Sequence, residues 1–291
     1  MDIRACQRGD LHRLFKYWKR VGTSIPYFFP VSASRWQTCL LEDELDGERV
    51  FKSLETHFVA ESNRVLGFVQ YGQPNFAWDE SGQKYYNPHI GVIRHLYFEK
   101  GRNDVGEALL AKAIDRLGRF RQNHAFYHIF GMSCNAHHGK LHSSQSHVEQ
   151  LLQTHGFTIE HENVYYELDM SVVESVGSSR LQFRDAHRGS EGNFKAQLNG
   201  ETIGTARVRY LDALTGGYIH DIAYLTWIGV HEQHRGMGVG SEFLQLLVAY
   251  LSSKGVRYLH TDTASDNLGA QRFYEGRGFH RQGYTRSYIK A

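Results

Sequence analysis

The sequence of 291 residues has little net charge, no long apolar run and few cysteines. Its formal charge of +2 is too small to favour a nucleic acid or an anionic membrane as the main partner. The longest apolar stretch, residues 243–251, contains Gln245 and is far shorter than a bilayer span. The first ten residues hold no apolar segment of the kind a signal peptide needs, so no signal peptide is expected.

Cys6, Cys39 and Cys134 are odd in number, scattered and outside any CxxC spacing. Neither a disulfide framework nor a zinc site is therefore expected, and a reducing cytoplasm is the expected compartment. One segment invites a metal interpretation through four histidines: His137, His138, His142 and His147. No acidic or cysteine ligand accompanies them in a chain that has 18 histidines, so we expect a polar loop and no metal.

The sequence does contain an internal repeat, which we interpret as two copies of one α/β unit. Three pairs of segments correspond in the same order: 57–68 with 193–205, 96–114 with 228–248, and 154–169 with 276–291. They indicate in turn a hairpin with an Asn-containing turn, a strand–loop–helix unit, and a strand after a Gly-Phe pair. We therefore expect an α/β (α+β) chain of two copies, residues 1–170 and 181–291, joined by a Ser-rich linker at 171–180.

The two copies differ at their starts. In the first, about fifty residues separate the opening strand from the strand at Phe58, which leaves room for two helices. In the second, the strand at 181–185 is followed almost at once by the strand at Phe194. We therefore expect the second copy to lack the leading helices and to begin its main amphipathic helix near Val239.

The second copy carries the segment HRGMGVGSEFLQ, 234–245, in which three glycines alternate just before that helix. Backbone N–H groups at a helix start can converge on an anion, assisted by the positive end of the helix dipole. A P-loop is excluded because Ser-Glu follows Gly240 in place of Lys-Ser/Thr. The dinucleotide pattern GxGxxG is excluded because the third glycine comes one residue too early.

The run Arg235-Gly236-Met237-Gly238-Val239-Gly240 fits Arg/Gln-x-x-Gly-x-Gly/Ala and resembles the acetyl-CoA pyrophosphate loop of the GCN5-related N-acetyltransferase (GNAT) superfamily. Residues 266–279, DNLGAQRFYEGRGF, resemble that superfamily's later motif, Asn-x-x-Ala-x-x-Phe-Tyr followed by Gly-Phe. Either motif alone is compatible with a helix start that binds nothing. Both together, in order and each after a β-run, favour the GNAT interpretation. The resemblance covers about residues 181–291 at motif level, and the first half more weakly.

This resemblance implies two tandem GNAT folds, each a mixed, mostly antiparallel sheet flanked by helices, in a layout similar to that of mycothiol synthases. It implies an acetyl-CoA-dependent N-acetyltransferase whose second copy takes a CoA thioester and a primary amine acceptor that the sequence does not identify. A catalytically inactive acyl-CoA sensor or regulatory module is the alternative. A positioned acid distinguishes the two, because a binding module has no use for one.

The resemblance also assigns residues to roles. The backbone amides of Ile228, Gly229 and Val230 would pair with the pantetheine arm, and that of Val230 would hold the oxyanion. Tyr274 would protonate the departing thiolate, and Asn267 would contact the pantetheine or the nearby helix end. The residues expected at the CoA pyrophosphate are Arg235, Gly236, Met237, Gly238, Val239, Gly240 and Ser241.

The general base is less clearly marked. By alternation, the acceptor-facing side of the strand carries His220, Ile222, Tyr224 and Thr226, of which only His220 titrates near neutrality. His220 is therefore the candidate base. An ordinary strand-end histidine, and a water chain with no dedicated base, are the alternatives.

The first copy lacks the residues expected for anion binding and for proton donation. Its loop at 101–106 is shorter by two residues, and Asp104 aligns with Gly238. A carboxylate there would repel a pyrophosphate, and Asp104 with Glu107 predicts a self-capping helix instead. Leu152 takes the place of Tyr274. We therefore expect the first copy to keep the fold without activity and to wall the acceptor site that the second copy leaves open.

Overall fold

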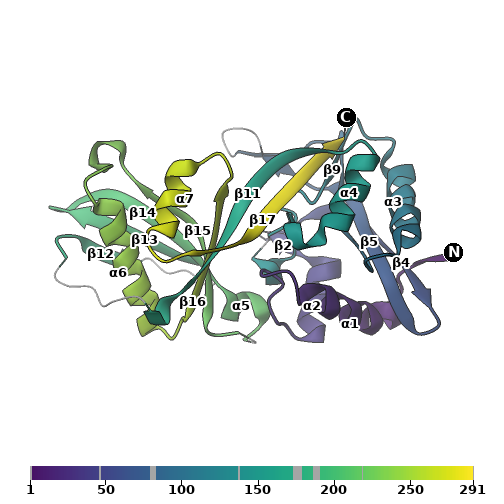
Figure 1. The fold of residues 1–291 in the computed structure, drawn as a ribbon, viewed down its shortest axis with the longest axis horizontal. Coiled ribbons are helices and arrows are strands. Elements are labelled where there is room, and N and C mark those ends of the chain that lie inside the picture. Colours follow the sequence, from purple (N-terminus) through teal and green to yellow (C-terminus); the bar gives the residue numbers. More distant parts are fainter. Residues whose placement is uncertain are drawn as a thin grey trace. The chain divides into compact units, whose positions relative to one another are not determined.

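The computed structural model describes residues 2–45, 47–78, 83–136, 138–172, 179–185, 191–217 and 219–290. The chain divides into two compact units, residues 1–162 with 284–291 and residues 163–283 (Figure 1). Most of the predicted linker 171–180 and also His137 lie outside the described residues. Over the described ranges, no helix is long and apolar enough to cross a membrane.

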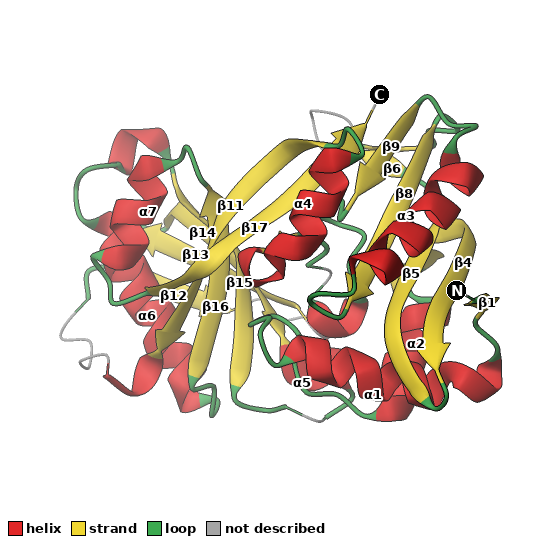
Figure 2. Ribbon diagram, turned by 45° about the vertical axis from the view of Figure 1, so that its right-hand side comes forward, coloured by secondary structure: helices red, strands yellow, loops and turns green. Residues whose placement is uncertain are grey.

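The first unit is a mixed sheet flanked by helices (Figure 2). Its strands lie in the order β1 (Ile3–Ala5), β4 (Phe51–Glu61), β5 (Arg64–Pro74), β8 (Ile90–Phe98), β9 (Gln122–Ala125) and β17 (His280–Lys290), with β10 (Leu141–His142) also on β17. Its helices are α1 (Leu11–Gly22), α2 (Ala33–Glu42), α3 (Asn103–Leu117) and α4 (Ser146–Thr154). Two short hairpins complete it: β2 (Glu44–Leu45) with β3 (Glu48–Arg49), and β6 (Ala77–Trp78) with β7 (Lys84–Tyr85).

Helices α1 and α3 cover opposite faces of β5. A Cβ atom added at Gly67 would meet Leu109 of α3 at 3.0 Å, whereas the ring of the next residue, Phe68, packs edge-on against Tyr17 of α1. Successive strand residues point to opposite sides of a sheet, so the two helices lie on different sides. The two leading helices expected in the first copy are therefore present, and α1 covers one face of the sheet.

The second unit has the same plan without those helices. Its strands lie in the order β11 (Thr158–Asp169), β16 (Tyr258–Ala264), β15 (Ile222–Val230), β14 (Glu201–Tyr210), β13 (Glu191–Leu198) and β12 (Gln182–Asp185). Its helices are α5 (Leu211–Thr215), α6 (Val239–Ser253) and α7 (Leu268–Glu275). Phe243 of α6 would lie 3.4 Å from a Cβ at Gly204, so α6 covers the face that α3 covers in the first unit. The predicted helix start at Val239 is confirmed.

The two units exchange their last strands. Strand β11 follows α4 of the first copy, yet from Asn163 onward it belongs to the second unit and pairs with β16. Strand β17 follows α7 of the second copy, yet from Tyr284 onward it belongs to the first unit and pairs with β9. In Figure 1, the yellow end of the chain accordingly joins the purple-to-teal unit. The predicted division at 1–170, 171–180 and 181–291 follows the sequence repeats. The compact units differ from it because each contains part of a strand that belongs to the other repeat.

One local prediction for the first copy is wrong. Helix α3 has Arg102 at its N-cap and no side-chain cap hydrogen bond, because Asp104 forms an ion pair with Arg102 at 2.9 Å in place of the expected capping box. In the histidine segment, His138 and His142 are buried, and His138 stacks on the ring of Tyr27 at 4.1 Å. Among the described residues, no group of three or more His, Cys, Asp or Glu could hold a metal ion.

Candidate active site

The second unit opens between two parallel strands. Strand β15 pairs with β16 from Ile222 to Leu225, and the pairing ends at Leu225 with Thr261. Beyond that point β15 continues to Val230 paired only with β14 among the described strands. At the same point the β14–β15 register shifts by one residue, which makes Thr226 a bulge. The two parallel strands therefore diverge after Leu225 and leave one edge of residues 226–230 unpaired.

The hydrogen-bond ladder shows which backbone groups face this opening. The His231 N–H donates to the Ile203 carbonyl at 2.8 Å, so the pair 231–203 is a hydrogen-bonded pair. Such pairs alternate in an antiparallel ladder, so the N–H groups of Ile228 and Val230 point away from β14 and into the opening. The N–H of Gly229 points toward β14. Of the three amides assigned to the thioester and its arm, two are thus placed to donate.

The glycine loop leads from this opening into α6. Gly236 and Gly238 have φ angles of +76° and +80°, and Gly238 is the helix N-cap. An added Cβ would meet nothing within 4 Å at either position, so the glycines are required by backbone conformation and not by crowding. Gly240 differs, since its φ is not positive and a Cβ would make only ordinary contacts with Phe273 and Val230.

The same loop presents unengaged N–H donors. In the described part of the chain, the N–H groups of Ser241 and Glu242 donate to the Gly238 carbonyl, whereas those of residues 236–240 donate to no acceptor. Arg235 donates from Nε to the Val230 carbonyl at 3.1 Å and is otherwise exposed, so its charge stays beside the loop. Met237 is 59% exposed. Ser241 bonds through its hydroxyl to Arg277, which adds a second cation at the helix start.

Tyr274 lies in α7 and contacts Thr261, the last residue of β16 that pairs with β15. It is 7% exposed and hydrogen-bonded to the side chain of Thr261, whose hydroxyl donates to the Leu225 carbonyl at 2.9 Å. Burial raises the pKa of Tyr274, and the hydrogen bond to Thr261 partly offsets this effect. The phenol therefore keeps its proton at neutral pH, as a proton donor to a thiolate must.

Asn267 and His220 are placed less favourably. Asn267 is the N-cap of α7 and accepts from the Ala270 N–H at 3.1 Å, so capping already accounts for its side-chain oxygen. His220 is exposed, precedes β15 and lines a hollow of about 450 Å³ with Tyr210 and Tyr250. The divergence begins at Thr226, about 20 Å farther along the strand at some 3.3 Å per residue. A base role for His220 stays a prediction that this position does not favour.

The structure adds a polar cluster that the sequence interpretation missed. On the sheet face opposite α6, the Tyr224 hydroxyl donates to Asp262 Oδ1 at 2.6 Å, and Asn163 Nδ2 donates to Asp262 Oδ2. Beside them the Tyr165 hydroxyl lies 3.2 Å from His260 Nδ1. Burial lowers the pKa of His260 to about 4, so its imidazole is neutral at pH 7. Alternation within 256–263 could have placed His260 and Asp262 on one face, but no sequence signal links them to β11.

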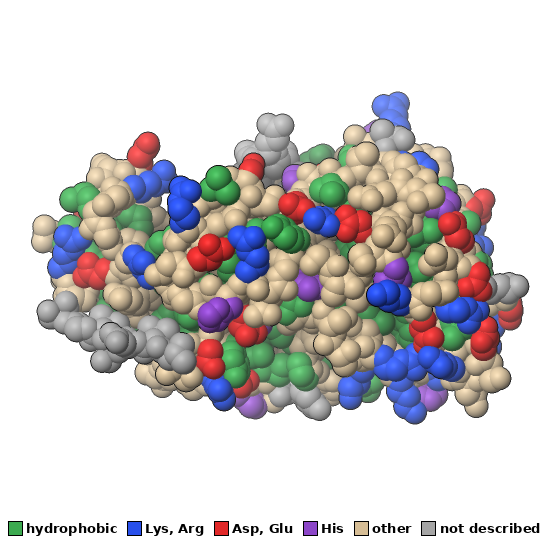
Figure 3. Space-filling model, in the orientation of Figure 1, with side chains coloured by type: hydrophobic (Ala, Val, Ile, Leu, Met, Phe, Trp, Pro, Cys, Tyr) green, Lys and Arg blue, Asp and Glu red, His purple; other side chains and the backbone are tan. Residues whose placement is uncertain are grey.

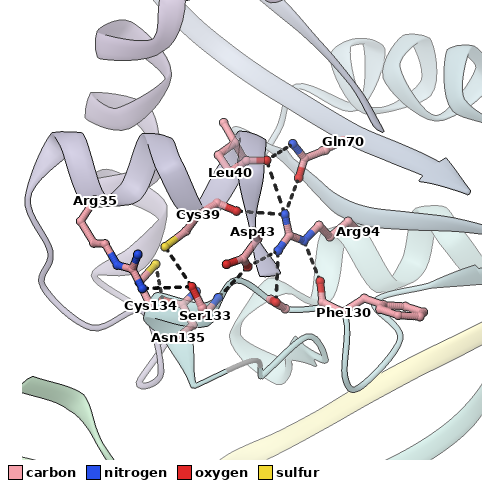
Figure 4. A network of polar contacts seen from close by, with 11 residues as sticks. Arg35, Cys39, Leu40, Asp43, Gln70, Arg94, Phe130, Ser133, Cys134 and Asn135 are labelled. Atoms are coloured by element: carbon pink, nitrogen blue, oxygen red, sulfur yellow. Dashed lines mark hydrogen bonds and ion pairs between the residues drawn. The ribbon is translucent and has the colours of Figure 1, made fainter. Parts of the chain in front are cut away.

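The equivalent position of the first unit is filled by the chain itself (Figure 4). There the β5–β8 register shifts at Arg94, which takes the position that Thr226 has in β15. The Arg94 side chain is fully buried and donates to Asp43 Oδ2 at 2.7 Å and to the carbonyls of Phe130 and Gly131 at 2.7 and 3.1 Å. Strand β9 ends at Ala125, so no long strand diverges from β8 as β16 does from β15.

Comparisons with known proteins agree with this geometry. Residues 158–279 match the family model for the acetyltransferase (GNAT) family. An N-alpha-acetyltransferase 60 from Xenopus tropicalis is 36% identical over 84 residues, which are 26% of this chain and 34% of the relative. The match thus spans about a third of that relative's length.

Solved structures share the fold over the whole chain. A tandem GNAT protein from the clavulanic acid biosynthesis pathway is 13% identical with a TM-score of 0.68, covering 99% of this chain and 98% of its own. A GCN5-related N-acetyltransferase from Sphaerobacter thermophilus is 12% identical with a TM-score of 0.63, covering 99% and 95%. At this level of identity, these matches show a shared fold. Residues 158–279 thus match the acetyltransferase (GNAT) family, within a chain whose fold is that of two tandem GNAT units.

Proposed function

We propose that the protein is an acetyl-CoA-dependent N-acetyltransferase that acts on a primary amine through its second unit. The observation that carries this proposal is the divergence of β15 from β16 after Leu225 and Thr261, directly before a helix start with unengaged N–H groups. A thioester arm fits an opening lined by strand amides, and a pyrophosphate fits a helix N-terminus.

In this proposal the N–H groups of residues 236–240, with Arg235 beside them, bind the CoA pyrophosphate. The N–H of Val230 faces the opening and stabilises the oxyanion that forms when the amine attacks the thioester carbonyl. Collapse of that intermediate breaks the C–S bond, and the Tyr274 hydroxyl protonates the departing thiolate. That the first copy walls the acceptor site, and that the protein acts in the cytoplasm, stay predictions.

The near-neutral surface also suits a small or peptide amine better than a polyanion. On the face shown in Figure 3, acidic and basic side chains are interspersed over most of the area, consistent with a formal charge of +2. Such a mixture of charges does not favour a positive electrostatic patch of the kind that attracts a nucleic acid.

The test combines binding with turnover. Titration calorimetry should detect one acetyl-CoA per chain, and release of free thiol from acetyl-CoA should depend on an added amine, with tyramine, spermidine and glucosamine as probes. Binding without turnover on any of these amines would favour an acyl-CoA sensor. No binding would refute both functions.

A further inference from the structure

The residue that follows the last paired position of β16 is a carboxylate. Pairing between β15 and β16 ends at Leu225 with Thr261, and Asp262 comes next. His260 pairs with Tyr224, so Asp262, two residues farther on, faces the same side as Tyr224. That side is opposite α6 and is partly open to solvent at Asp262. Asp262 therefore lies where the opening begins, on the face from which an acceptor can approach.

Two buried or half-buried donors fix the orientation of this carboxylate. The Tyr224 hydroxyl donates to Oδ1 at 2.6 Å, and Asn163 Nδ2 donates to Oδ2. Tyr224 is 5% exposed, so its hydroxyl has little freedom to turn elsewhere. A carboxylate oxygen can accept from more than one donor, and the Asp262 side chain is partly exposed to solvent.

The charge of Asp262 reaches both sides of the sheet. Burial raises the pKa of Tyr165 and Tyr224 on the face of Asp262 and of Tyr274 on the α7 face, and the charge of Asp262 raises each of them further. Other titratable groups of this cluster are His260, which is neutral at pH 7, and Glu167, whose carboxylate lies 3.5 Å from His260 Nε2. Arg209 faces Tyr224, where it acts to lower the pKa of that phenol, and is itself paired with Glu191 at 3.1 Å. A carboxylate thus lies at the start of the opening, close enough to the proposed proton donor Tyr274 to act on its pKa.

We propose that Asp262 receives the acceptor amine, binds its ammonium form and faces the nitrogen while the new C–N bond forms. This inference rests on the proposed function and names the substrate class, a primary amine that is cationic at neutral pH. The ammonium must lose one proton to attack, and water beside Asp262 accepts that proton, so Asp262 remains a carboxylate. The amine then adds to the thioester carbonyl, and its nitrogen becomes positively charged. Asp262 stabilises this charge as Val230 N–H stabilises the oxyanion.

All bonds and protons of this transfer are accounted for by the amine, the thioester, the two side chains and solvent. The C–N bond forms, the C–S bond breaks, and the thiolate takes the proton of Tyr274. The nitrogen then releases its second proton toward Asp262, and solvent restores both side chains. Asn163 and Tyr224 act as positioning residues, because each holds one oxygen of Asp262. Asn163 belongs to β11, so a residue that precedes the predicted linker orients the site of the second copy.

The test is Asp262→Asn in the full chain with tyramine as the probe. Loss of a hydrogen bond to a charged group predicts a fall of about 10- to 100-fold in kcat/KM for tyramine. The Kd of acetyl-CoA should stay within twofold of the wild-type value. Asp262→Glu keeps the charge and should recover part of the rate. Asn163→Ala should lower kcat/KM less and shift its pH profile, because the carboxylate loses one of its two donors.

Asp266→Asn is the matched control, since Asp266 is an exposed carboxylate between β16 and α7, and its kcat/KM should not change. A second comparison uses 4-aminophenol, an uncharged amine, for which Asp262→Asn should have a smaller effect. Wild-type kcat/KM with tyramine in Asp262→Asn would overturn this inference and leave the proposed function standing. Loss of acetyl-CoA binding in Asp262→Asn would also overturn it. A wild-type chain that acetylates none of the amines would refute the proposed function together with this inference.

Discussion

The two units use the same strand register and differ in what occupies the position where the central strands separate. In both, the third strand of the meander carries a one-residue shift, at Arg94 in β8 and at Thr226 in β15. In both, the strand ends with a matching hydrogen bond, from the Glu99 N–H to the Leu66 carbonyl and from the His231 N–H to the Ile203 carbonyl. The difference is one side chain, because a buried guanidinium stands where the second unit has an exposed threonine.

From this comparison we expect two separate features to keep the first unit from binding CoA. The helix start after β8 holds Asp104, where an anion would meet a carboxylate. The opening itself is filled by Arg94 and the carbonyl groups that it binds. A single substitution at either position therefore leaves the other block in place. The second unit lacks both blocks and adds Tyr274, for which the first unit has Leu152, buried and without a proton to give.

The largest expected effect separates chemistry from binding at Tyr274. Tyr274→Phe removes one hydroxyl, so kcat should fall by about 10²- to 10⁴-fold, the usual loss for a general acid. The Kd of acetyl-CoA should stay within a few-fold, because Thr261 keeps its bond to the Leu225 carbonyl. Thiol release and calorimetry measure the two quantities.

Tyr166→Phe is the control for that substitution. Tyr166 also comes from the α7 face and lies 5.8 Å from Tyr274 ring to ring, but its hydroxyl donates to Glu275 and not toward the opening. Its turnover should stay within twofold of wild type. Equal losses in the two variants would mean that Tyr274 acts through packing.

The next effect concerns the side chain that fills the first unit. Arg94→Met removes the partner of buried Asp43, and breaking a buried ion pair costs about 3–5 kcal/mol of unfolding free energy. Urea denaturation followed by circular dichroism measures it. Arg64→Met is the control, because the Arg64 side chain is 65% exposed in its pair with Glu99 and such a pair contributes about 0–1 kcal/mol. If the two variants lost the same stability, the buried pair of Arg94 and Asp43 would contribute no more than the exposed pair of Arg64 and Glu99.

The third prediction places at Gly238 of the second unit the carboxylate that the first unit has at Asp104. Gly238 has φ +80°, which Asn and Asp tolerate better than other L residues, and a Cβ there meets nothing within 4 Å. Gly238→Asp and Gly238→Asn therefore share their backbone strain and differ only in charge. Like charges brought together cost several kcal/mol, so acetyl-CoA should bind Gly238→Asp about tenfold or more weakly than Gly238→Asn. Equal affinities would mean that the pyrophosphate binds elsewhere.

How far the sequence predicts this molecule depends on how local each feature is. The repeat, the leading helices and the start of α6 follow from spacing and periodicity within short windows, and the structure confirms them. The exchange of β11 and β17 could not be predicted, because the two strands follow equivalent helices and their sequences do not say which sheet each joins. Asp262 and Asn163 were missed for the same reason, since their contact depends on long-range register. Alternation placed His220 on a face but could not show that it lies far from the opening.

The smallest expected effect tests a residue with two possible roles. Asn267 and Gln145 occupy equivalent N-cap positions, but only Asn267 makes a side-chain cap hydrogen bond, to the Ala270 N–H. Asn267→Ala should lower the unfolding free energy by about 1 kcal/mol, as loss of a cap usually does. Asn267→Asp keeps an acceptor oxygen and should restore that stability. If the Asn267 amide donated to the pantetheine arm, Asn267→Asp would instead stay stable while its Kd for acetyl-CoA rose. Because the cap already engages the side-chain oxygen, we expect rescue of stability and a change of less than about threefold in Kd, within the range of one weak hydrogen bond.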